Sequence, residues 1–136
     1  MNGRAIHTSR ANEGNTEPAF CGPSEISATT IVADHNGRGP IAIRRLMARS
    51  PSSAIDFVDY TVIPPGSSIG RHQHVDSEEL YLIVDGRPIV LVEAVARRLR
   101  PGDVAIVRAN QCHELMNDTS DPVTLFIVQV ALYTPT

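Results

Sequence analysis

The sequence of 136 residues contains no lysine, and all twelve of its cationic side chains are arginines. Enzymes that form a Schiff base, or that use a side-chain amine as a general base, need a lysine for that step. Only the α-amino group could take its place in this chain. Imine chemistry is therefore close to excluded.

Long apolar runs, tryptophan and cysteine are also missing or scarce. No stretch approaches the ~20 apolar residues of a membrane span, and the N-terminus has no apolar segment typical of a signal peptide. Two cysteines, Cys21 and Cys112, do not make a disulfide framework, which favours the cytoplasm. The net charge of −3, without a basic stripe, argues against nucleic acid as a partner.

The amino-acid composition of the sequence changes near residue 40. Residues 1–40 are polar, rich in Asn, Ser, Thr, Gly and Pro, and end in the turn cluster HNGRGP. We expect them to form an arm that docks on the main domain or on a dimer partner, because a free tail of this composition would be disordered. Residues 41–136 are expected to form one domain.

From residue 41 onward, short runs rich in β-branched residues alternate with turns, and none has a helical period. We expect strands over 41–47, 55–64, 103–109, 112–117 and 123–132. The stretch 78–92 indicates a hairpin that turns at Asp85-Gly86, and 94–103 alternates before a turn at Pro101-Gly102. Several short strands at close spacing predict an all-β sandwich or small barrel.

Two histidines and a glutamate stand close together in RHQHVDSEE, residues 71–79. On a strand, His72 and His74 would point to the same face and could reach one ion with metal–nitrogen bonds of about 2.1 Å. Glu79 could approach from the next strand, with Tyr81 on its face and Glu78 on the other. The alternative is that these side chains are structural polar groups whose hydrogen bonds are satisfied within the protein, without an ion.

A further ligand has to come from the remaining histidines. His7 and His35 lie in the polar arm or its terminal turn, whereas His113 follows a turn at the start of an expected strand. We therefore expect His113 to complete a set of three imidazoles and one carboxylate. That set suits one divalent transition metal and leaves open positions for a small ligand; Fe, Mn, Co, Ni and Zn all fit.

Two stretches of the sequence resemble the conserved motifs of the cupin superfamily. The first motif is matched in residue and spacing by Gly66, His72, His74, Glu79 and Gly86, and the second by Gly102, His113 and Asn117. The chain departs from the second motif at its internal Pro-x-Gly, which is Arg108-Ala109-Asn110 here. Asn110 can still adopt the left-handed conformation that glycine would supply.

This resemblance implies a double-stranded β-helix, or jelly roll, with a metal at the bottom of the barrel mouth. It also implies a homodimer, commonly formed through N-terminal strands. Fe or Mn is the favoured ion, with Ni, Co or Zn as alternatives.

Other residues are weaker candidates for the site. Tyr81 could act with Glu79 and His113 in catalysis as an acid or a hydrogen-bond donor, although a core tyrosine is an equal alternative. Arg108 could clamp a substrate carboxylate, with Gln111 and Met116 bordering the cavity. The simpler interpretations are that Arg108 is exposed to solvent and that Met116 packs against neighbouring side chains.

Three functional classes follow, and all act on a small molecule. A dioxygenase-type enzyme is narrowly favoured, because dioxygenase-type cupins carry this ligand set. The runner-up is a non-redox lyase, isomerase, dehydratase or cyclase, such as a tailoring enzyme of natural-product biosynthesis. A binding or sensing protein without turnover comes third.

Overall fold

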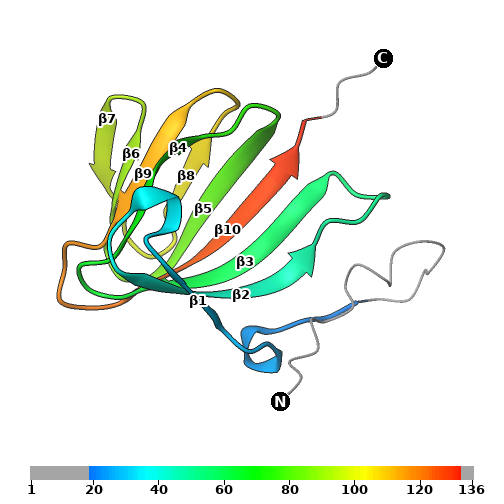
Figure 1. Cartoon of the computed structure of the whole chain (residues 1–136), viewed down its shortest axis with the longest axis horizontal. Coiled ribbons are helices and arrows are strands. Elements are labelled where there is room, and N and C mark those ends of the chain that lie inside the picture. Colours follow the sequence, from blue (N-terminus) through cyan, green and yellow to red (C-terminus); the bar gives the residue numbers. More distant parts are fainter. Residues whose placement is uncertain (1–18, 133–136) are drawn as a thin grey trace.

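The computed structural model describes residues 19–132, in which two antiparallel sheets face each other (Figure 1). Two short 3₁₀ helices, η2 (Pro23–Glu25) and η3 (Asp34–Asn36), precede the main domain. The strands are β1 (Thr29–Val32), β2 (Pro40–Ala48), β3 (Ile55–Ile63), β4 (Ser68–Gln73), β5 (Ser77–Asp85), β6 (Ile89–Val92), β7 (Val95–Arg98), β8 (Val104–Val107), β9 (Cys112–Met116) and β10 (Val123–Ala131).

The six-stranded sheet has the order β1-β2-β3-β10-β5-β8, and the four-stranded sheet has the order β4-β9-β6-β7. The all-β jelly roll expected from the sequence is confirmed. There is no α-helix among residues 19–132, and within that range no helix is long and apolar enough to cross a membrane.

The predicted hairpin over 78–92 is wrong, because β5 and β6 belong to different sheets. β5 pairs with β10 and β8, whereas β6 pairs with β9 and β7. Asp85-Gly86 is therefore a crossing between the sheets. Gly86 has a φ of +85°, and a Cβ there would come within 2.6 Å of the Pro122 carbonyl oxygen. The same turn chemistry fits a hairpin and a sheet-to-sheet crossing, which misled the sequence-based prediction.

Residues 19–40 follow the edge of the main domain. β1 was not predicted from the sequence; it pairs antiparallel with β2 and extends the six-stranded sheet. The η3 turn lies beside β4 (Figure 1), so closely that a Cβ at Gly70 would overlap the His35 carbonyl oxygen. Residues 1–18 of the predicted arm lie outside the described residues, and the division near residue 40 stays a prediction.

Alternate residues of each long strand point between the sheets and form the core. On β5 and β10 the burial alternates along most of the strand, which is the period of two expected for a sheet with one packed face. The buried cluster consists of Ile41, Ile63, Ile69, Tyr81, Ile83, Val90, Leu99, Leu115, Val123, Leu125 and Ile127.

Candidate metal centre

Three histidines and one glutamate converge between the two sheets. His72 lies on β4 and His74 just beyond it, Glu79 lies on β5, and His113 lies on β9. Each offers one ligand atom, and these atoms all lie within 4.8 Å of one another. The structure therefore brings together the four residues that the sequence predicted as metal ligands.

The pairing of the strands explains this convergence. His72 and His113 are direct partners across β4 and β9, so the four-stranded sheet presents two imidazoles side by side. Their ring centroids are 4.1 Å apart. Glu79 faces them from the opposite sheet, where it is 4% exposed. The site is thus assembled across the barrel.

A backbone hydrogen bond fixes the orientation of His72. Its Nδ1 lies 2.7 Å from the Gly70 carbonyl oxygen. A carbonyl can only accept, so Nδ1 carries the proton and Nε2 is left as a basic nitrogen able to bind a metal. The His35 ring also stacks on His72, with centroids 3.7 Å apart and planes 8° apart.

Glu79 interacts with the other two imidazoles. Its carboxylate oxygens lie 3.1 Å from His113 Nε2 and 3.1 Å from His74 Nε2. Burial alone would raise the pKa of Glu79, but these imidazoles outweigh it and lower the pKa to about 2. The interaction with Glu79 raises the pKa of His74, whereas burial lowers the pKa of His72 to about 4. Glu79 is therefore an anion and His72 a neutral base near neutral pH.

The donor set fits one divalent transition metal. His74 Nε2 is buried, and its 3.1 Å contact with Glu79 lacks hydrogen-bond geometry, so it has no hydrogen-bond partner among the described residues. A buried polar atom without a partner is costly and calls for an explanation such as a ligand. Three imidazoles with one carboxylate meet that requirement and leave a net charge of +1 on a divalent ion.

The centre opens into a cavity of about 270 Å³. This volume lies below the roughly 300–1,000 Å³ of pockets that take drug-sized molecules. Its walls include the apolar side chains Ile31, Ile41, Ile43, Phe57, Ile69 and Ile127. Its polar lining comprises Asp34, His35, Arg45, Asp59, His72, His74, Glu79, Tyr81 and Gln129. The ligand that this space accepts is small.

Tyr81 lines the cavity two residues after Glu79. It is 0% exposed, and its hydroxyl has no hydrogen-bond partner among residues 19–132. Burial raises the pKa of Tyr81 well above its usual value, so the phenol keeps its proton. A protonated hydroxyl beside the ligand set can donate a hydrogen bond or a proton to a bound molecule.

The predicted substrate-binding residues lie elsewhere. Arg108 forms an ion pair with Glu78 at 2.8 Å, and Gln111 accepts the Arg108 backbone N–H. Met116 borders a separate surface groove. None of the three lines the metal cavity, and their role in substrate binding stays a prediction. Asn110 adopts the expected left-handed conformation, with a φ of +68°.

Five polar cavity residues were not predicted from the sequence. Asp59, Arg45 and Gln129 come from β3, β2 and β10, far from the His-x-His motif, and Asp34 and His35 come from η3 in the arm. The inward alternation of buried positions on β3 could have indicated Asp59. Nothing in the sequence around Arg45 or His35 marks either as a cavity residue.

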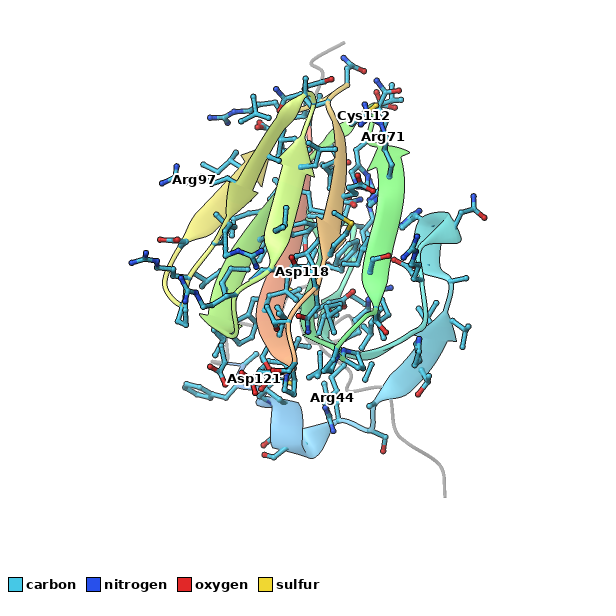
Figure 2. The ribbon with its side chains drawn as sticks, turned by 90° about the vertical axis from the view of Figure 1, so that its left-hand side faces the viewer. Arg44, Arg71, Arg97, Cys112, Asp118 and Asp121 are labelled. Atoms are coloured by element: carbon cyan, nitrogen blue, oxygen red, sulfur yellow. The ribbon has the colours of Figure 1, made fainter. Side chains whose placement is uncertain are left out.

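The ends of the four-stranded sheet carry further polar side chains. Figure 2 looks onto this sheet and shows Cys112 and Arg71 together at one end, with Asp118 nearer the middle of the view. Cys112 pairs in register with Gln73 and forms no disulfide. Neither Cys112 nor Arg71 lines the metal cavity.

The model of the cupin domain family matches residues 59–129. The oxalate-binding protein of Thermotoga maritima is 24% identical over 110 residues, covering 80% of this chain and 91% of that protein. A solved structure described as a predicted oxalate decarboxylase from T. maritima has a TM-score of 0.81 at 23% identity, covering 84% of this chain and all of the other. KdgF from Halomonas sp. has a TM-score of 0.68 at 19% identity, covering 87% and 96%.

Proposed function

The chain belongs to the cupin domain family, and from that premise we propose that it is a metal-dependent enzyme that oxidises a small organic molecule with O₂. One observation carries the proposal: three imidazoles and one carboxylate converge at a cavity of about 270 Å³. A closed structural site would leave no space for a ligand beside the ion. This one has such a space.

The four residues His72, His74, Glu79 and His113 would hold the metal. A divalent ion here would supply Lewis acidity and, as Fe or Mn, the redox chemistry that O₂ requires. The apolar walls of the cavity would exclude water from the bound molecule. Tyr81 would donate a hydrogen bond from its buried hydroxyl to the reacting group.

The likeness to a protein called oxalate-binding supports a carboxylate as the group that meets the metal. A carboxylate is a hard oxygen ligand, and its charge complements the net +1 of the loaded centre. We therefore rank small organic acids first among the candidate substrates.

The test begins with metal content. We expect protein purified without a metal-binding tag to carry near-stoichiometric Fe or Mn in inductively coupled plasma mass spectrometry, and His72→Ala to carry none. The Fe(II)-loaded protein should then consume O₂ when a panel of small organic acids is added, and not before. Turnover of the same acid under nitrogen would contradict the oxygenase reaction.

A second candidate function is a non-redox reaction, such as decarboxylation, elimination or isomerisation. The observation that favours it is the unpartnered hydroxyl of Tyr81, a proton donor beside the ligand set. Such an enzyme would work under nitrogen and accept Zn. Product formation by the Zn-loaded protein, with a loss of roughly a hundredfold in Tyr81→Phe, would support it. A pure binding protein would hold the acid and form no product with any ion.

A further inference from the structure

Arg45 is the sole arginine among the residues that line the metal cavity. Its Nε donates to Asp59 Oδ1 at 2.9 Å, and its Nη2 donates to Asp59 Oδ2 at 3.0 Å. The guanidinium also lies over the Phe57 ring, 4.6 Å from the ring centroid. A paired carboxylate and a stacked ring together hold this cation in one orientation.

The register of the six-stranded sheet fixes where this cation lies relative to the metal ligands. Arg45 pairs with Asp59, Asp59 pairs with Ile127, and Ile127 pairs with Tyr81. These residues form one inward-facing row across four strands. Asp59 and Tyr81 are two strand spacings apart, roughly 10 Å. The Arg45–Asp59 pair therefore lies on the same sheet as Glu79, two to three strands away from β5 along the cavity wall.

The pair leaves part of the guanidinium free. Asp59 is 4% exposed, and its carboxylate takes the edge formed by Nε and Nη2. Nη1 has no hydrogen-bond partner among residues 19–132, and the Arg45 side chain is 53% exposed. A guanidinium can bind a second carboxylate through its other edge, formed by Nη1 and Nη2.

We infer that Arg45 is a second anion-binding site in the metal cavity, and that the substrate is a small dicarboxylate whose far carboxylate binds there. The inference rests on the proposed function, in which the near end of the substrate meets the metal. Because Asp59 and Tyr81 are two strand spacings apart, roughly 10 Å, we expect succinate or a longer diacid to span from the metal to Arg45, and a two-carbon diacid such as oxalate to be too short.

A purely structural role for Arg45 is the competing explanation, because buried Asp59 needs a partner. Another pair in the chain provides the matched control. Arg98 donates from Nη1 and Nη2 to the two oxygens of Asp118 at 2.9 and 2.8 Å, so this pair is also bidentate but uses the other edge of the guanidinium; Arg98 does not line the metal cavity. Figure 2 shows Asp118 on the side of the four-stranded sheet.

The experiment measures binding to the Zn-loaded full chain by isothermal titration calorimetry. Succinate and butyrate have the same number of carbons and differ by one carboxylate, so the ratio of their Kd values isolates the far group. We expect succinate to bind about ten- to a hundredfold more tightly than butyrate, as for a charged hydrogen-bonded contact. We expect Arg45→Gln to bring that ratio close to one, and Arg98→Gln to leave it unchanged.

Arg45→Gln leaves buried Asp59 without its partner and can unfold the protein, so the double variant Arg45→Gln with Asp59→Asn is measured beside it. If the pair is only structural, the double variant regains both the fold and the preference for succinate. If Arg45 binds the substrate, the double variant regains the fold and the zinc but not the preference for succinate.

The outcomes separate this inference from the proposed function. Two results would overturn the Arg45 site but not the proposed metal enzyme, provided that zinc is retained. In one, the parent protein binds both acids with equal affinity; in the other, the preference for succinate survives in the double variant. A parent protein that takes up no metal would overturn the proposed function, and with it this inference.

Discussion

Two buried polar clusters lie at opposite ends of β9, and they differ in how their hydrogen bonds are satisfied. Near the start of the strand, His113 belongs to the metal centre, where His74 Nε2, His113 Nδ1 and the Tyr81 hydroxyl have no hydrogen-bond partner among the described residues. Just beyond its end, Asn117 is 1% exposed and fully bonded.

The Asn117 side chain closes the loop around it. Its Nδ2 donates to the carbonyls of Ile63 and Asp121, and its Oδ1 accepts from the backbone and the hydroxyl of Thr119. A network that satisfies itself stabilises the fold and needs no ligand. The centre around His113 is incomplete until something binds. Buried polar groups are thus satisfied within the protein at one end of the strand and left open for a ligand at the other.

We call the cluster around His113 the open cluster and the network around Asn117 the closed cluster. Removing one of the metal ligands from the open cluster should abolish metal binding, and with it any reaction there. This is the largest effect we expect. His72→Ala and His113→Ala should lose their metal after dialysis, because three donors bind the ion more weakly than four. His35→Ala is the matched control, since His35 shares the cavity and stacks on His72 but is not a ligand. Metal content by mass spectrometry checks this. Equal loss in all three variants would contradict the assignment.

Breaking the closed cluster should affect stability and leave the metal in place. Asn117→Ala removes the side-chain donor to the buried Ile63 carbonyl and the acceptor of Thr119, and we expect the free energy of unfolding to fall by about 2–4 kcal/mol. Urea denaturation measures the change, and the metal content of the folded variant serves as the control. A variant as stable as the parent would show that this network is dispensable.

The open cluster should also respond to pH, whereas the closed one contains no titrating side chain. The contact with Glu79 raises the pKa of His74 above its usual 6.5, so at a pH below that raised value the metal must displace a proton from His74. His72, with a pKa near 4, is already neutral. Below the pKa of His74, zinc affinity should rise with pH by up to about tenfold per unit, and it should level off above that pKa. Competition with a chromophoric chelator measures this, and a flat profile would contradict it.

The smallest effect on stability is expected at Tyr81. Its hydroxyl is buried without a partner among the described residues, so its removal costs no hydrogen bond. Tyr81→Phe should keep the free energy of unfolding within about 0.5 kcal/mol of the parent, or raise it. A loss of more than about 2 kcal/mol in thermal or urea unfolding would show that the hydroxyl is bonded, and Tyr81 would then resemble Asn117.

The sequence predicted which four residues converge at the candidate metal centre, because they lie within two short motifs of fixed spacing. His72, His74 and Glu79 are separated by only seven positions, and strand periodicity alone places both histidines on one face. Strands β2, β3, β8 and β10 were also predicted from local signals, since each contains β-branched residues in a short run, and β9 was predicted because it follows a turn.

What the sequence did not predict depends on pairing between distant strands. Arg45 and Asp59 reach the cavity through the order β2-β3-β10-β5, which no local pattern reveals. The Asp85-Gly86 turn was misread as a hairpin, because the choice of sheet for β6 is made by β9 and β7. His35 approaches His72 only because η3 lies on β4. The homodimer and the role of Arg108 stay predictions.

The position of β10 has a consequence for how the protein forms during synthesis. It is the last described strand in the sequence, yet it lies between β3 and β5 and pairs with both along most of its length. The six-stranded sheet therefore cannot close at its centre until β10 has left the ribosome. Contacts so distant in sequence slow folding and expose unpaired strand edges in the meantime. Glu79, which pairs with Gln129 of β10, is therefore fixed in place only after β10 has been made, and metal uptake is expected to follow it.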